Sequence, residues 1–77
     1  MRVAPGVTLD NVRLGPNVSI EAGCEIRNAT LRDCIIGRDT IIRNAELHDS
    51  LIGDSVHLEN VHGVANAGDH TSMIGGS

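Results

Sequence analysis

LRDCIIGRDTIIRNAE (residues 31–46) and LHDSLIGDSVHLENVH (residues 47–62) are consecutive segments in which the aliphatic residues recur every 16 positions. The segment before them, LGPNVSIEAGCEIRNAT (residues 14–30), has the same outline with one extra residue. Within each repeat, a large aliphatic residue follows every five or six residues. That spacing fits neither the alternation of a β-strand nor the 3.6-residue period of a helix. It predicts a solenoid whose coils have three short sides, each supplying one inward Ile, Leu or Val.

Aligning the repeats places the large aliphatic residues in three columns, one for each side of the coil. The first side holds Val3, Ile20, Ile36 and Ile52, the second holds Leu9, Ile26, Ile42 and Leu58, and the third holds Leu14, Leu31 and Leu47. The columns advance by 17 and then 16 residues, so a single insertion explains every offset. A second inward position on each side holds a smaller residue, and this alternation lets stacked coils interdigitate. We therefore predict an all-β chain folded as a triangular parallel solenoid of about three and a half to four coils.

Units of six residues in this chain resemble those of the hexapeptide-repeat family of left-handed parallel β-helices. The clearest are LGPNVS (residues 14–19), IGRDTI (36–41) and IGDSVH (52–57). The five-residue units IRNAT, LRDCI, IRNAE and LHDSL look like those in the C-terminal β-helix of sugar-1-phosphate nucleotidyltransferases. The resemblance covers roughly residues 3–62. It implies a single-stranded, left-handed β-helix that serves assembly and regulation, because in that family another domain, absent here, performs catalysis.

The length and composition predict one small domain, residues 1–77. The chain has no Phe, Tyr or Trp, which suits a thin aliphatic prism better than a compact globule with aromatic bulk in its core. We expect the coils to span residues 3–62. Gly63 stands where the next large aliphatic residue would fall. Residues 63–66 are therefore interpreted as a loop, and 67–77 as a C-terminal cap or an exchanged segment that covers a neighbour's end.

The net charge of −4 and the lack of stacking aromatics argue against a nucleic-acid partner. The sequence shows no signal peptide, long apolar run or lipidation motif, so we expect a cytoplasmic protein with no membrane contact and no cofactor. Cys24 and Cys34 fall in inward positions on different sides of the solenoid. They are interpreted as reduced core thiols rather than a disulfide.

Turn residues recur at the corners between the sides. One corner is expected to carry a ladder of four asparagines, Asn11, Asn28, Asn44 and Asn60. Asparagine tolerates the left-handed backbone that a tight corner needs, and stacked amides can bond along the column. Asp33 and Asp49 hold the equivalent place at a second corner, and Gly37 and Gly53 are expected to relax the third.

Some outward positions carry aliphatic residues instead of polar ones, which suggests a contact surface. Ile35 and Leu51 fall one above the other, and Ile41 falls on the adjoining side. Together with Met73 and Ile74 of the C-terminal segment, they form the predicted oligomer interface. We expect a homodimer, with a homotrimer as the alternative. The resemblance adds a nucleotidyltransferase-type protein as a candidate partner.

The sequence contains no nucleotide-binding loop, Walker motif or serine elbow, and no catalytic residue or metal site is assigned. Hexapeptide acyltransferases use a histidine as general base, and His57 would be that base here. The spacing of His57 and His62 resembles a zinc-ligand pair of γ-class carbonic anhydrases, although the two fall on consecutive sides and a third ligand would have to come from another chain. We interpret both histidines as solvated surface residues in preference to either role. The favoured interpretation is a non-catalytic structural and oligomerisation module. An acyltransferase or zinc-dependent fragment that acts at an inter-chain site is the alternative.

Overall fold

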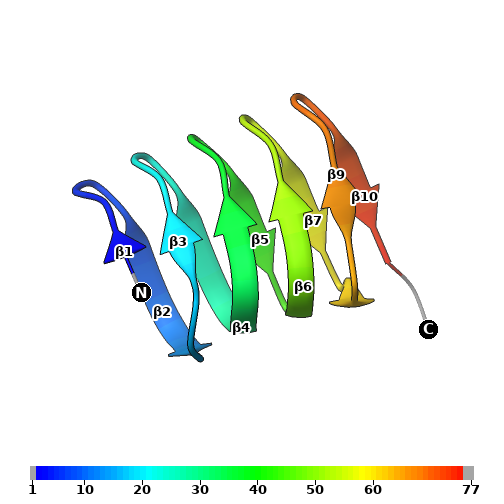
Figure 1. The fold of residues 1–77 in the computed structure, drawn as a ribbon. Helices are drawn as coiled ribbons and strands as arrows, with labels where there is room; N and C mark the ends of the chain where they lie inside the picture. Colours follow the sequence, from blue (N-terminus) through cyan, green and yellow to red (C-terminus); the bar gives the residue numbers. More distant parts are fainter. Residues whose placement is uncertain (1, 76–77) are drawn as a thin grey trace.

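A computed structural model of the chain describes residues 2–75, apart from the side chain of Met73. Ten strands and no helix occur in this range, and they form one sheet in which every pair is parallel. The strands are β1 (Arg2–Val3), β2 (Thr8–Leu14), β3 (Ser19–Ile20), β4 (Glu25–Ile36), β5 (Ile41–Arg43), β6 (Glu46–Ile52), β7 (His57–Glu59), β8 (His62–Gly63), β9 (Asn66–Ala67) and β10 (Ser72–Ile74). The sheet winds into a β-solenoid of about four turns, which confirms the predicted fold class (Figure 1).

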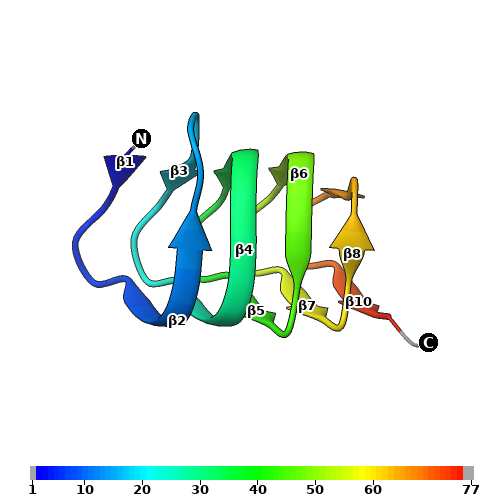
Figure 2. The same ribbon diagram turned by 90° about the horizontal axis from the view of Figure 1, so that it is seen from below.

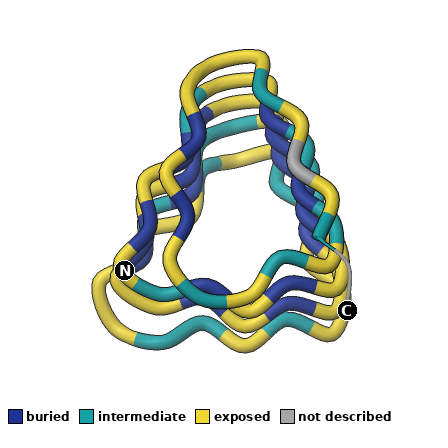
Figure 3. The backbone as a smooth tube through the Cα atoms, turned by 90° about the vertical axis from the view of Figure 1, so that its right-hand side faces the viewer, coloured by how far each residue is buried: buried dark blue, intermediate teal, exposed yellow. Residues whose placement is uncertain are grey.

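The coils are triangular in cross-section and stack along one axis (Figures 2 and 3). The first side is formed by β1, β3, the ends of β4 and β6, and β9. The second is formed by the starts of β2 and β4 with β5, β7 and β10, and the third by the remainder of β2, β4 and β6 with β8. Backbone pairing joins Ile20 to Ile36 and Ile36 to Ile52, so the predicted columns are confirmed.

The coils become shorter along the chain. Along the first side, paired residues are separated by 17 positions from Val3 to Ile20, by 16 in the next two steps, and by 15 from Ile52 to Ala67. The first difference agrees with the single insertion seen in the sequence. The shortening from 16 to 15 positions arises at the corner after Gly63, where the Ala65 N–H donates to Ser50 Oγ at 3.0 Å.

The C-terminal segment differs from the loop and cap expected for residues 63–66 and 67–77. Strands β8, β9 and β10 pair in parallel with the preceding coil, and the amide of Gly75 still donates to the carbonyl of Glu59 at 2.7 Å. As expected, Gly63 takes the place of the large aliphatic residue and pairs with Leu47. The backbone therefore continues the solenoid where the aliphatic pattern fades.

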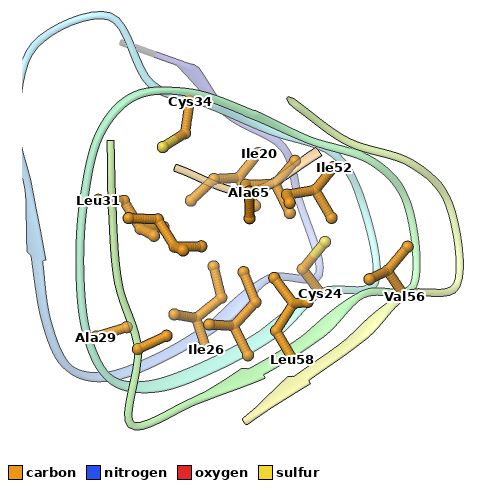
Figure 4. Packing of buried hydrophobic residues seen from close by; sticks show 14 of the residues in the cluster. Ile20, Cys24, Ile26, Ala29, Leu31, Cys34, Ile52, Val56, Leu58 and Ala65 are labelled. Carbon is orange, nitrogen blue, oxygen red and sulfur yellow. The ribbon is translucent and has the colours of Figure 1, made fainter. Parts of the chain in front are cut away.

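Side chains from all three sides fill the interior without aromatic residues, as Figure 4 shows. The inward Ile and Leu residues of the middle coils are fully buried. Each contributes about 1.5–3 kcal/mol relative to an exposed position. The inward polar groups are hydrogen-bonded: Cys24 Sγ donates to the Gly37 carbonyl at 2.9 Å, and Thr40 Oγ1 donates to the Gly53 carbonyl at 3.1 Å. Both Cys24 and Cys34 are buried, free thiols, as predicted.

Each corner turns on a residue with positive φ. Asn11, Asn28, Asn44 and Asn60 have φ between 51° and 56°, so all four stand at left-handed corner positions. Asn11 Nδ2 donates to Asn28 Oδ1 at 2.9 Å along that ladder. At the second corner, Asn17 Nδ2 likewise donates to Asp33 Oδ1 at 2.9 Å. Both hydrogen bonds join side chains of the first two coils and so link these coils at two corners.

The third corner is built differently from the expectation. Its positive φ falls on Gly6, Gly23, Asp39, Ser55 and His70. Gly37 and Gly53 are therefore not needed for left-handed backbone there. They are needed for space, because a Cβ on Gly37 would overlap the backbone of Gly53 in the next coil.

The two ends of the solenoid differ in how well their inward residues are covered. Val3 and Leu9 of the first coil are 40% and 41% exposed. In the last coil, the inward Ala65 and Ala67 are only 3% and 6% exposed. The inward aliphatic residues of the N-terminal coil are thus partly open to solvent, whereas the small inward residues Ala65 and Ala67 of the last coil are buried.

Candidate functional site

The outer surface of the first side carries two aliphatic residues at its centre. Ile35 at the end of β4 and Leu51 at the end of β6 are direct backbone partners. They are 53% and 56% exposed. The complete outward column on this side is Arg2, Ser19, Ile35, Leu51 and Asn66. Its four C-terminal members carry no charge, so they form a flat, neutral patch.

The other two sides are charged on their outer surfaces. On the second side, Arg27 stacks on Arg43 and forms an ion pair with Glu25, whose Oε1 lies 2.9 Å from Arg27 Nη2. On the third side, the paired residues include Thr30 with Glu46 and Arg32 with His48. Charged groups of this kind are well solvated and resist burial in an interface. The first side is therefore the face best suited to contact with another protein.

The predicted interface residues are distributed over two sides of the solenoid. Ile35 and Leu51 lie together, as predicted. Ile41 is half-buried on the second side, where it pairs with His57. Ile74 is 69% exposed on β10, also on the second side, and the side chain of Met73 lies outside the described residues.

The histidines are separated by the triangular cross-section. His57 projects from β7 on the second side and His62 from β8 on the third, as the alignment had placed them. His57 is half-buried, and its Nε2 atom is buried without a hydrogen-bond partner among residues 2–75. A general base normally has a second group that orients its ring, and no group of this range contacts His57 Nε2 in that way. The same described range contains no group of three or more His, Cys, Asp or Glu residues arranged to hold a metal.

The corner between the first and second sides carries a pattern that the sequence analysis did not single out. Arg38 and Asp54 are equivalent positions in successive coils, and Asp54 Oδ1 accepts a hydrogen bond from the Arg38 amide at 2.8 Å. Asp69 repeats this contact with the amide of Asp54, also at 2.8 Å. The Arg38 guanidinium makes no ion pair with any residue in the described part of the chain. The alignment that revealed the aliphatic columns also contained this charged column.

The stability of the fold should fall at high pH because of Cys24. Burial raises the pKa of the Cys24 thiol, and the nearby carboxylates of Asp39 and Glu21 raise it further, although backbone hydrogen bonds oppose the shift. The unfolded chain loses this proton at about pH 8.5, while the folded chain still holds it. The contribution of the neutral thiol is therefore present below that pH and lost as the pH rises through the folded-state pKa.

The chain contains no Lys or Tyr, so few other side chains titrate in this range. Urea unfolding at pH 7 and pH 10 should show a larger loss of stability for the wild type than for Cys24→Val. Valine is a suitable replacement because Val7 and Val56 occupy the same position in other coils. An equal loss in both proteins would mean that Cys24 does not cause the pH dependence.

No helix within residues 2–75 has the length and hydropathy needed to cross a membrane. Comparison of the chain with protein-family models, with curated proteins and with solved structures finds no significant match in any of the three.

Proposed function

We propose that this chain is a non-catalytic assembly module that associates with a second copy of itself through its first side. The observation that supports the proposal is the stacked pair Ile35 and Leu51, more than half exposed at the centre of a neutral face. The other two faces carry charges, and one of them an ion pair. An exposed aliphatic pair on so small a protein is typical of a contact surface.

The resemblance to hexapeptide-repeat β-helices supports the same function. The C-terminal β-helices of sugar-1-phosphate nucleotidyltransferases, which this chain resembles in its five-residue and six-residue units, serve assembly rather than catalysis. A nucleotidyltransferase-type protein is accordingly a second candidate partner for this face. The β-solenoid itself does not specify either role.

The size of the exposed pair predicts a weak dimer. Full burial of a Leu or Ile contributes about 1.5–3 kcal/mol, so four half-exposed side chains contribute on the order of 5 kcal/mol. Association must also offset at least about 4 kcal/mol of lost rigid-body freedom. Surrounding contacts would have to supply the remainder, and we expect a dissociation constant in the micromolar range or weaker. Light scattering should therefore be done at several concentrations across a hundredfold dilution.

Replacing both Ile35 and Leu51 with glutamate should convert the dimer into a monomer. Each carboxylate would have to be buried without a partner, which is far more costly than losing the aliphatic contact alone. Native mass by light scattering or sedimentation gives the result directly. Circular dichroism confirms that the variant remains folded.

A single substitution provides a matched control for this experiment. Thr30→Glu creates the same kind of stacked carboxylate pair, with Glu46, on the same two strands but on the third side. This variant should remain a dimer. A wild-type protein that is monomeric at high concentration would contradict the proposal. So would a trimer that forms only with zinc, which would instead favour an inter-chain site that uses His57 and His62.

A further inference from the structure

From Ser19 to Asn66, the outward column of the first side has nearly the same sequence of polar and aliphatic residues in either direction. In this range it consists of a small polar residue, two aliphatic residues and another small polar residue. A twofold interface brings each position of a surface against a different position of its copy, and each contact occurs twice. A column with this symmetry can therefore match itself in the antiparallel direction.

We propose that two copies pack first side against first side with their solenoid axes antiparallel, about a twofold axis that runs along the strands between Ile35 and Leu51. This inference rests on the proposed function and specifies its geometry. Ile35 of each copy then contacts Leu51 of the other, and Ser19 faces Asn66 of the other. Two sheets that meet in this way keep their strand directions aligned, as sheet packing generally requires.

The charge pattern at the edge of the face fits the same arrangement. The operation that brings residue 35 against residue 51 also brings Arg38 of one copy to Asp54 of the other, since both lie three positions further along the chain. This pairing occurs twice and uses a guanidinium that has no ion-pair partner among the described residues. At the opposite corner Asp33 faces Asp49, a like-charge contact that offsets part of this attraction.

The extent of the face restricts how the two copies can overlap. The molecule measures 32 × 23 × 20 Å, so one whole face offers roughly 600 Å², somewhat less than the roughly 800 Å² that each partner buries in a standard interface. A dimer must consequently use most of the face. An axis between Ile35 and Leu51 overlaps four of the five strand layers on this side. The layer left outside contains Arg2, the one charged residue of the column.

The parallel alternative fits less well. A twofold axis along the solenoid would bring each coil against the same coil of the copy, so that Arg2 would face Arg2. The corner charges do not distinguish the two arrangements, because this one opposes Asp33 to Arg38 in one coil as well as Asp49 to Asp54 in the next. The contact between the two Arg2 side chains is what disfavours it. Like charges directly opposed across an interface disfavour association.

Cross-linking of variants that each carry one added surface cysteine distinguishes the two arrangements. Ser19→Cys and Asn66→Cys place a reactive thiol at the two ends of the neutral patch. The native Cys24 and Cys34 are buried, so the folded wild type should not react and serves as the control. Each variant alone, and an equimolar mixture, is treated with a short bis-maleimide at a concentration where the wild type is dimeric.

The antiparallel register predicts a covalent dimer in the mixture and little product from either variant alone. Cross-linking of each variant with itself would overturn the proposal in favour of the parallel arrangement, while the proposed self-association would stand. Absence of a cross-link from all three samples would overturn the lateral geometry if the wild type is dimeric. A monomeric wild type would overturn the proposed function itself.

A charge substitution gives an independent measurement. Arg38→Glu should raise the dissociation constant of the dimer about tenfold or more, because it places a carboxylate instead of a guanidinium against Asp54 of the other copy. Arg43→Glu on the second side makes the same change in net charge away from the interface and should have little effect. Equal weakening by both variants would contradict the proposed register.

Discussion

Replacing Leu31 with alanine is expected to lower the free energy of unfolding by about 3–5 kcal/mol. Leu31 lies on the third side between Leu14 and Leu47 and is completely buried. The narrow interior cannot collapse around the missing atoms without shifting the stacked coils. A small domain has only about 5–10 kcal/mol of stability in total, so a large share of the molecules should be unfolded at 37 °C.

Leu9→Ala provides the comparison that isolates burial. It removes the same atoms from an inward position, but Leu9 is 41% exposed at the open N-terminal end. This substitution should cost about 1 kcal/mol, or somewhat more where coil contacts are lost. Urea unfolding measured by far-ultraviolet circular dichroism gives both values. If the two substitutions had similar effects, the stacked columns could not be the main source of stability.

Gly37→Ala is expected to destabilise the fold by roughly 3 kcal/mol or more. A Cβ at this position would overlap backbone atoms of Gly53 and the side chain of Asp54 in the next coil. Backbone atoms cannot move aside as the end of a flexible side chain can. The substitution would therefore push two coils apart at one corner and disturb the hydrogen bond between Asp54 and the Arg38 amide.

Gly68→Ala is the matched control, because Gly68 occupies the same corner position one coil after Gly53. The nearest atom to a Cβ there is Thr71 Oγ1 at 4.0 Å, which is no closer than ordinary contact. Its effect on stability should be small, and the same urea experiment measures it. A large loss in Gly68→Ala would show that the glycines are needed for their conformation rather than for the space they leave.

The fold could be predicted because the inward side chains alone determine the columns. In a triangular coil each side contributes one large aliphatic residue, so the spacing of Ile20, Ile36 and Ile52 contains the register directly. The last coil escapes such a prediction because Gly63 and Ala67 occupy inward positions where the pattern requires large aliphatic residues. In the last coil, backbone hydrogen bonds maintain the structure. A pattern of hydrophobic side chains cannot reveal such bonds.

The candidate site could be predicted only in part. Ile35 and Leu51 are recognisable as outward residues because they immediately precede inward ones in the same strands. Ile41 satisfies the same rule and lies on the adjoining second side, where the alignment had placed it. The role of Gly37 is hard to predict because a glycine at a corner suggests backbone freedom, whereas close approach between coils depends on the neighbouring backbone.

Because the coils shorten along the chain, the two ends of the solenoid differ in shape, and this difference bears on whether copies can stack end to end. Repeated head-to-tail contacts produce open fibres, and exposed strand edges invite them. Here the open end presents Val3 and Leu9, but the opposite end offers Gly63, Ala65 and Ala67 on a narrower coil. On the first and third sides, a second copy placed there would meet these small residues instead of Ile or Leu. The inward residues of the two ends therefore do not match on the first and third sides, which works against end-on stacking of copies there.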